Sequence, residues 1–328
     1  MLLYFKSQNV CMLDIASPFF VNLLIVVASL YILFKSADLM VFGIADYARK
    51  FGLSDYLVGL VVIAMAASAP EIIASIMGLQ YEGSGIVFGA IIGSNMVHMA
   101  LAVGILAVIG RRINVECRIL NKALFPLWVM LMLPFILAAD GVLSRPDGLI
   151  LVGLFVVYIV FLWRQEGTLG RIKPRVMLKS LWLDAFIFLG CLVALLLAGR
   201  WLVFGAVNLA NVFNLTPYFI SLTVIGIGTT IPDFAIELRS LFRRHEAIGL
   251  GDILGSLVIE LVLYFGILSL VRPLVIDFTN VWSASLFLVG SISFMLYIIS
   301  RKVLTWKHGV ILLGIYALFF GVELFKVV

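Results

Sequence analysis

The sequence predicts an all-α membrane protein with ten transmembrane helices arranged as two five-helix repeats of inverted topology. Three observations predict this fold: an apolar composition, the number of apolar segments long enough to span a bilayer, and an internal repeat at a fixed offset of 162 residues. Of the 328 residues, 63% are hydrophobic and 12% are charged. A soluble protein of this length could not bury so much apolar surface, whereas a bilayer removes the need to bury it.

The apolar segments have the length of membrane spans. A spanning helix needs about 20 mainly apolar residues to cross a hydrocarbon core about 30 Å thick. The first and sixth segments are longer than this core, so we expect both helices to tilt or to extend into the interface. We predict helices at 18–48, 52–79, 84–110, 123–139, 147–163, 181–210, 215–241, 247–271, 281–300 and 308–326.

The basic residues predict the orientation of the chain in the membrane. The loops after the odd-numbered spans hold 17 of the 23 Lys and Arg residues, whereas the loops after spans 2, 4, 6 and 8 hold only Arg145 and Arg272. Because basic loops stay on the cytoplasmic side, both termini should lie outside and the central loop should be cytoplasmic. The net charge of +5 is therefore a topology signal and does not indicate a nucleic-acid partner. We expect a multi-pass protein of the cell membrane that functions as a monomer in the lipid bilayer.

The repeat divides the chain into two halves. Residues 41–110 align with 203–272 without a gap and share 21 identities in 70 positions, among them Pro70 with Pro232 and Gly93 with Gly255. Each half has five spans, an odd number, so the second half must enter the membrane from the opposite side. The predicted organisation is an extracellular segment 1–17, a first repeat 18–163, a cytoplasmic linker 164–180 and a second repeat 181–328. Three scattered cysteines without a CxxC pair indicate neither a disulfide nor a metal site.

Two spans carry an acid directly after a proline. Span 2 contains Ser68-Ala69-Pro70-Glu71, and span 7 contains Thr230-Ile231-Pro232-Asp233. Proline removes one helix hydrogen bond and so frees backbone oxygens just before the acid. The hydroxyl and the carboxylate of each motif are three residues apart and share a helix face. Such oxygens are the hard ligands that Ca²⁺ and similar cations prefer.

Spans 3 and 8 supply a second pair of polar faces. Ser94 and His98 are four residues apart, as are their repeat mates Ser256 and Glu260. An ionisable group in mid-membrane costs about 2.5–3.5 kcal/mol and normally marks an ion or proton pathway. The acids therefore favour a functional site. The hydroxyls could equally serve as helix–helix contacts, and a lone His can be a satisfied core residue.

These motifs resemble those of the cation/calcium exchanger superfamily, and of the sodium/calcium exchangers in particular. That family has two repeats of the form G-T-S-x-P-E/D followed by G-N-x-x-G-S-N-x-x-N/D. The matches here are Ala67-Ser68-Ala69-Pro70-Glu71 with Gly93-Ser94-Asn95, and Gly228-Thr229-Thr230-Ile231-Pro232-Asp233 with Gly251-Asp252-Ile253-Leu254-Gly255-Ser256. The resemblance implies that Glu71 and Asp233 are central calcium ligands and that His98 and Glu260 complete the site. It implies further ligands from backbone carbonyls near Ala64, Ala67, Gly226 and Thr229 and from the hydroxyls of Ser68, Thr230, Ser94 and Ser256.

The resemblance also implies a function. We expect a secondary active antiporter, not an enzyme, that exchanges Ca²⁺ for Na⁺ by alternating access and needs no cofactor. A proton-coupled exchanger of Ca²⁺ or another divalent cation is the alternative, because His98 stands where the family has Asn and histidine titrates near neutrality. Asp233 in place of Glu resembles the potassium-dependent branch. A cation channel would need pore-lining rings. An intramembrane aspartyl-type enzyme would not explain the hydroxyls beside both acids.

Overall fold

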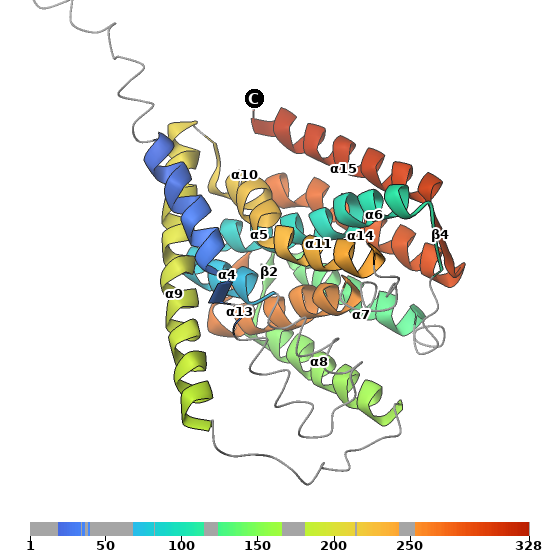
Figure 1. The fold of residues 1–328 in the computed structure, drawn as a ribbon, viewed down its shortest axis with the longest axis horizontal. Helices are drawn as coiled ribbons and strands as arrows, with labels where there is room; N and C mark the ends of the chain where they lie inside the picture. The colour runs from blue at the N-terminus through green and yellow to red at the C-terminus, as the bar shows by residue number, and fades with distance from the viewer. Residues whose placement is uncertain are drawn as a thin grey trace, which may run out of the picture.

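A computed structural model of the chain describes residues 19–33, 35–36, 39, 68–81, 83–114, 124–165, 181–213, 215–242 and 253–327. The predicted segment 1–17, most of the linker 164–180 and several of the basic loops lie outside the described residues. A described helix overlaps each of the ten predicted spans, and the described part of the structure is almost wholly helical (Figure 1). The helices of the first half are Phe19–Leu33; α4 (Ala69–Tyr81); α5 (Ser84–Met96), which continues as η2 (Val97–Ala102) and α6 (Val103–Gly110); α7 (Leu124–Leu137), which continues as η4 (Ala138–Asp140); and α8 (Arg145–Gln165). The helices of the second half are α9 (Leu181–Val212); α10 (Pro217–Ile220), which continues as η6 (Ser221–Ile225) and α11 (Gly226–Phe242); the helix Ile253–Val271, which includes η7 (Ile259–Tyr264) and α13 (Phe265–Val271); α14 (Phe278–Ser300); and α15 (Trp306–Val327).

Local sequence signals account for several helix ends. Thr216 precedes α10, and its hydroxyl accepts a hydrogen bond from the backbone N–H of Phe219, with Pro217 at the first helical position. Asp277 begins α14 in the same way through the N–H of Thr279. The chain turns after η4 at Gly141, whose φ of 93° is a left-handed conformation that glycine adopts without steric cost.

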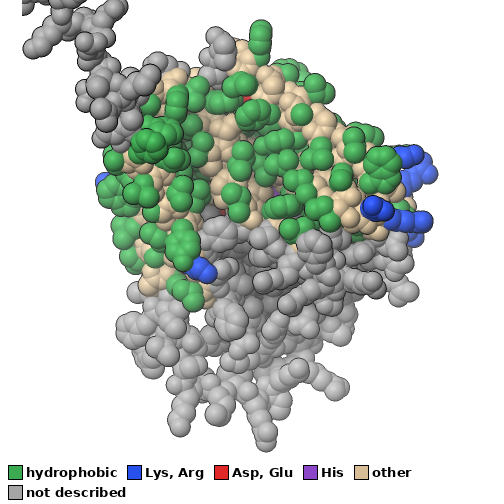
Figure 2. Space-filling model, turned by 45° about the horizontal axis from the view of Figure 1, so that its top comes forward, with side chains coloured by type: hydrophobic (Ala, Val, Ile, Leu, Met, Phe, Trp, Pro, Cys, Tyr) green, Lys and Arg blue, Asp and Glu red, His purple; other side chains and the backbone are tan. Residues whose placement is uncertain are grey.

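Four of the described helices are long and apolar enough to cross a membrane: Ser84–Gly110, Ile253–Val271, Val281–Ser300 and Trp306–Lys326. The first two are 83% and 89% buried by other parts of the protein, so they form the centre of the bundle, whereas Trp306–Lys326 is only 22% buried. Figure 2 shows hydrophobic side chains spread over the described part of the visible face, with the Lys and Arg side chains drawn there lying toward its edges. Such an apolar surface suits contact with lipid.

The two halves are related by the 162-residue offset in the structure as well as in the sequence. Strand β1 (Arg112–Asn114) pairs with β4 (Val303–Thr305), and β2 (Val142–Leu143) pairs with β3 (Leu274–Val275). The repeat mate of Arg112 is Leu274, and the repeat mate of Thr305 is Leu143. Arg112 pairs with Thr305, and their mates Leu274 and Leu143 pair with each other in the same way. The π-helices η2 and η7 also begin 162 residues apart. A symmetric exchange of partners between halves is what an inverted repeat requires.

Glycines bring span 3 and span 7 into backbone contact. An added Cβ at Gly93 would lie 2.2 Å from the carbonyl oxygen of Leu222, and one at Gly226 would lie 2.8 Å from the backbone of Gly93 and Ser94. No side chain fits at either position. Small residues let membrane helices approach this closely, and the approach sets the crossing at which the polar residues of both halves meet.

Helix α9 and the first helix form one flank of the molecule (Figure 1). Residues Val26, Leu33, Leu202 and Ala206 of these helices belong to a hydrophobic cluster separate from the main core. Asn208 Nδ2 of α9 donates to Asn22 Oδ1 of the first helix over 3.3 Å. The two long first helices of the repeats therefore contact one another across the halves.

Replacing Gly93 with alanine should destabilise the bundle, because the new methyl group must displace the backbone of Leu222. We expect the free energy of unfolding in detergent to fall by about 1–3 kcal/mol, the usual cost of overpacking. Gly290→Ala in α14 is the matched control, because no atom among the described residues lies within 4 Å of its added Cβ. Equal thermal unfolding of the two variants would contradict the packing described for Gly93.

Candidate cation-binding site

Polar side chains gather in the interior where α4, α5 with η2, α11 and the helix Ile253–Val271 cross. All the described side chains of the predicted ligand set are at most 1% exposed, although each of them carries a hydroxyl, a carboxylate or an imidazole group. Polar groups are buried at this density only where they satisfy one another or hold a ligand. The set comprises Ser68, Glu71, Ser94, His98, Thr229, Thr230, Asp233, Ser256 and Glu260.

Pro232 does not act as a simple helix break. Helix α11 continues from Gly226 through Pro232 to Phe242, so the proline does not end this helix. Because Pro232 has no N–H, the carbonyl of Gly228 one turn earlier lacks its usual helical donor. The irregular turn lies further upstream, in the π-helix η6 directly before Gly226. π-turns of this kind occur frequently at functional sites.

Glu260 is held by two donors from the other half of the chain. Ser94 Oγ lies 2.7 Å from Glu260 Oε2, and Asn95 Nδ2 lies 2.9 Å from the same oxygen. Within the described part of the chain, Glu260 Oε1 accepts no hydrogen bond. One carboxylate oxygen is therefore saturated, while the other remains available to a further partner.

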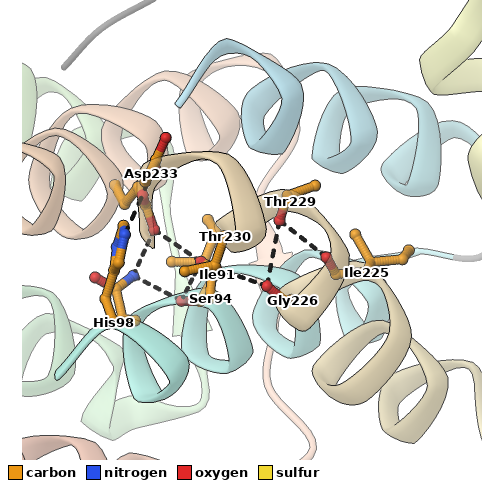
Figure 3. A network of polar contacts seen from close by, with 10 residues as sticks. Ile91, Ser94, His98, Ile225, Gly226, Thr229, Thr230 and Asp233 are labelled. Carbon is orange, nitrogen blue, oxygen red and sulfur yellow. Dashed lines mark hydrogen bonds and ion pairs between the residues drawn. The ribbon is translucent and has the colours of Figure 1, made fainter. Parts of the chain in front are cut away.

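His98 and Asp233 form a second contact between the halves (Figure 3). The Nε2 atom of His98 lies 3.6 Å from Oδ2 of Asp233, an ion pair only when the imidazole is protonated. Both side chains are almost completely buried. Span 3 thus contacts an acid of span 7 through His98 and the acid of span 8 through Ser94.

The threonines of span 7 direct their hydroxyl hydrogens into their own helix. Thr230 Oγ1 donates to the carbonyl of Gly226 at 2.7 Å, and Thr229 Oγ1 donates to the carbonyl of Ile225 at 2.9 Å (Figure 3). The lone pairs of both hydroxyl oxygens remain available. The Gly226 carbonyl, an expected ligand, also lies 3.4 Å from Thr229 Oγ1, so two threonine hydroxyls already contact this oxygen.

Several buried oxygens have no hydrogen-bond partner in the part of the chain that the structure describes. They include Ser68 Oγ, both oxygens of Glu71, Ser256 Oγ and Glu260 Oε1. The hydroxyls of Thr229 and Ser68 nevertheless lie close enough to Glu71 and Glu260, respectively, to interact weakly with these carboxylates. The carboxylates of Glu71 and Glu260 lie near enough for their charges to interact. Buried acceptors that lack donors are costly unless a cation or a proton compensates them. The donor set therefore fits hard cations such as Ca²⁺ and Na⁺.

The geometry limits how one ion could be held. Among the residues described, no three His, Cys, Asp or Glu side chains converge as one metal centre. A cation placed here would therefore take part of its ligands from hydroxyls and backbone carbonyls. The predicted carbonyl ligands Ala64 and Ala67 lie outside the described residues.

Two residues of this cluster were missing from the predicted ligand set. Asn95 lies within the G-S-N match, which could have identified it. Tyr264 is 3% exposed, and its hydroxyl interacts electrostatically with Glu71, Asp233 and Glu260. Tyr264 is four residues after Glu260 on the same helix face, a spacing visible in the sequence.

A helical fold of two inverted halves, with buried carboxylate and hydroxyl oxygens where the halves cross, defines a membrane ion transporter of the inverted-repeat class. The chain belongs to the family described as sodium/calcium exchanger protein, which it matches over residues 21–164 and 183–325. The two matched segments begin 162 residues apart, as the internal repeat does. Membership in a transporter family confirms the prediction that the chain is not an enzyme.

Known relatives and solved structures agree with this assignment. The chain is 30% identical over 261 residues to the putative antiporter CaxA of Alkalimonas amylolytica, covering 77% of this chain and 81% of that protein. Its structure is similar to that of the H⁺/Ca²⁺ exchanger CAX, with a TM-score of 0.76, 14% identity and coverage of 95% of this chain and 92% of the other. The sodium-calcium exchanger NCX_Mj gives a TM-score of 0.65 with 23% identity, covering 92% and 98%. These similarities confirm the predicted fold class.

Two serines of the site should respond differently to removal of their hydroxyls. Ser94→Ala takes a donor from a buried carboxylate and should lower the free energy of unfolding by about 1–3 kcal/mol. Ser256→Ala removes a hydroxyl without a hydrogen-bond partner in the described residues, so its unfolding without added ions should change by less than about 0.5 kcal/mol. Thermal unfolding in detergent with and without Ca²⁺ measures both. A large ion-independent loss in Ser256→Ala would show that this hydroxyl has a structural partner.

Proposed function

We propose that this protein is a secondary active antiporter that exchanges Ca²⁺ for Na⁺ by alternating access. The observation that carries the proposal is the set of buried carboxylate and hydroxyl oxygens, contributed by both halves, that lack donors in the described residues. The names of the structural relatives, a sodium-calcium exchanger and an H⁺/Ca²⁺ exchanger, support calcium as the transported divalent cation.

Charge balance supports the pairing of Na⁺ with Ca²⁺. Glu71, Asp233 and Glu260 can carry three negative charges at full ionisation, which three monovalent cations would match. One divalent cation leaves an excess of negative charge that a proton could absorb, since close carboxylates disfavour joint ionisation. One site can thereby hold either ion at different times, which is the requirement for antiport.

The flank of the molecule supports a moving part. The first helix and α9 pack on one another, and the hydrophobic cluster that holds them, which is separate from the main core, also includes Ile73 of α4 and Ile86 of α5. We infer that these two helices slide as a unit against the remaining eight and expose the site to each side in turn. The basic loops favour a cytoplasmic linker 164–180 with both termini outside. We further propose that the protein works as a monomer in the cell membrane.

Proton coupling is the second candidate, and one observation favours it. His98 contacts Asp233 across the halves, where the family has an asparagine. A titratable ring at this point could exchange a proton in place of Na⁺. Coupling to K⁺ is a further possibility for the same site, since Asp233 resembles the residue of the potassium-dependent branch.

Flux through proteoliposomes tests the proposed function. An imposed Na⁺ gradient should drive Ca²⁺ in the opposite direction, and Glu71→Gln or Asp233→Asn should reduce this flux at least 100-fold, because a neutral amide lacks the charge that the ion needs. Gly290→Ala, far from any packing contact in the described residues, is the matched control. If a proton gradient drives Ca²⁺ movement and a Na⁺ gradient drives none at any pH, the sodium proposal fails.

His98→Asn separates the two coupling ions. We expect this variant to retain Na⁺-driven Ca²⁺ flux within about tenfold of the wild type, because asparagine keeps a polar group at the position without a titratable ring. The measurement is the initial Ca²⁺ flux under a Na⁺ gradient and, separately, under a proton gradient. A wild-type flux that follows protons and disappears in His98→Asn would favour the proton-coupled alternative.

A further inference from the structure

The carboxylate of Glu260 is bound unequally at its two oxygens. Ser94 and Asn95 both direct donors to Oε2, at 2.7 Å and 2.9 Å, whereas Oε1 has no well-formed hydrogen bond within the described residues, although the Ser68 hydroxyl lies near the carboxylate. A carboxylate that rotated freely would distribute its donors over both oxygens. Glu260 is therefore oriented, with Oε1 as the oxygen left for a cation.

Asn95 is itself held in one orientation. Its Nδ2 atom lies 2.7 Å from the carbonyl oxygen of Ile91, four residues earlier, and 2.9 Å from Glu260 Oε2. Both of these partners are acceptors, so a flipped amide would place oxygen against oxygen. Two hydrogen bonds thus use both amide hydrogens and join α5 of the first half to η7 of the second.

The second half has no equivalent of this amide. The repeat mate of Asn95 is Leu257, which has no donor, and the mate of Glu260 is His98. The amide contact that orients Glu260 therefore has no counterpart from Leu257 in the second half. Since Asn95 is completely buried, its desolvated donors interact strongly with a charged acceptor.

We propose that Asn95 is a positioning residue that occupies Glu260 Oε2 and presents Oε1 to the transported cation as a single-oxygen ligand. This inference rests on the proposed cation exchange at the same site. Ca²⁺ can bind a carboxylate through one oxygen or through two. With Oε2 occupied by Ser94 and Asn95, Glu260 binds through one oxygen and leaves the other coordination positions to hydroxyls and carbonyls of the site.

Transport kinetics test this role. Asn95→Leu keeps the branched four-atom skeleton of the side chain, although its two methyl groups are bulkier than the amide, and installs the residue that the second half has at this position. The KM for Ca²⁺ should rise about 10- to 100-fold, the effect of losing one hydrogen bond to a charged group. The turnover number at saturating Ca²⁺ should change less than threefold. Leu257→Ala is the control, because it changes packing at the repeat mate of Asn95 without removing a hydrogen bond. This variant should leave the KM for Ca²⁺ within about threefold of the wild-type value.

A double-mutant cycle separates positioning from a general loss of structure. In the Glu260→Gln background, Asn95→Leu should have little further effect on the KM, because the charge it orients is absent. Equal effects of Asn95→Leu in both backgrounds, or an unchanged KM in the single variant, would overturn the proposal. If liposomes that contain the wild-type protein exchange no cation at all, the proposed antiport function is wrong, and this result differs from an unchanged KM in Asn95→Leu, which contradicts only the positioning role.

A measurement on the unmodified protein covers the case in which Asn95→Leu does not fold. Infrared difference spectra between Na⁺-bound and Ca²⁺-bound protein report the splitting of the carboxylate stretches, and the Glu260 bands are identified by their loss in Glu260→Gln. We expect the wide splitting of a carboxylate that binds through one oxygen. A narrow, two-oxygen splitting for Glu260 with Ca²⁺ would overturn the inference.

Discussion

Three carboxylates lie in the centre of a helical bundle that crosses a membrane, and this unfavourable burial governs the rest of the structure. Glu71, Asp233 and Glu260 are at most 1% exposed, and an ionised group at this depth costs several kcal/mol unless another group compensates it. The compensation is incomplete within the described residues, because Glu71 has only a weak contact with the Thr229 hydroxyl and the well-formed hydrogen bonds to Glu260 reach one of its two oxygens. This shortage of positive charge is what the proposed exchange uses, in which one cation leaves the site when another takes its place.

The inverted repeat provides the geometry that such a site needs. Gly93 and Gly226 allow spans 3 and 7 to touch through their backbones, so their polar side chains meet at short range. The π-turns η2 and η7 carry His98 and Glu260 at equivalent positions of the two halves. Because the halves exchange partners, the contacts of His98 with Asp233 and of Ser94 and Asn95 with Glu260 join one repeat to the other. Movement of one half relative to the other would therefore alter the ligand set directly.

Much of this arrangement could be predicted from the sequence, because it follows from composition and repetition. The ten spans follow from apolar length, and the acids and hydroxyls follow from helical spacing within each repeat. Contacts between the halves could not be predicted in this way. The hydrogen bond from Asn95 to Glu260 joins residues 165 positions apart, and the helix through Pro232 remains continuous although a proline usually breaks or kinks it. Both depend on tertiary packing that no local pattern encodes.

The asymmetry of the site follows from these contacts between halves. Glu260 receives two donors from span 3, whereas Asp233 contacts the imidazole of His98. A neutral imidazole offers Asp233 at most a hydrogen bond and leaves its charge in place, but a protonated one would cancel that charge. In the proposed exchange, the charge that transported cations meet would therefore depend on the protonation of His98 in the first half, acting on Asp233 in the second.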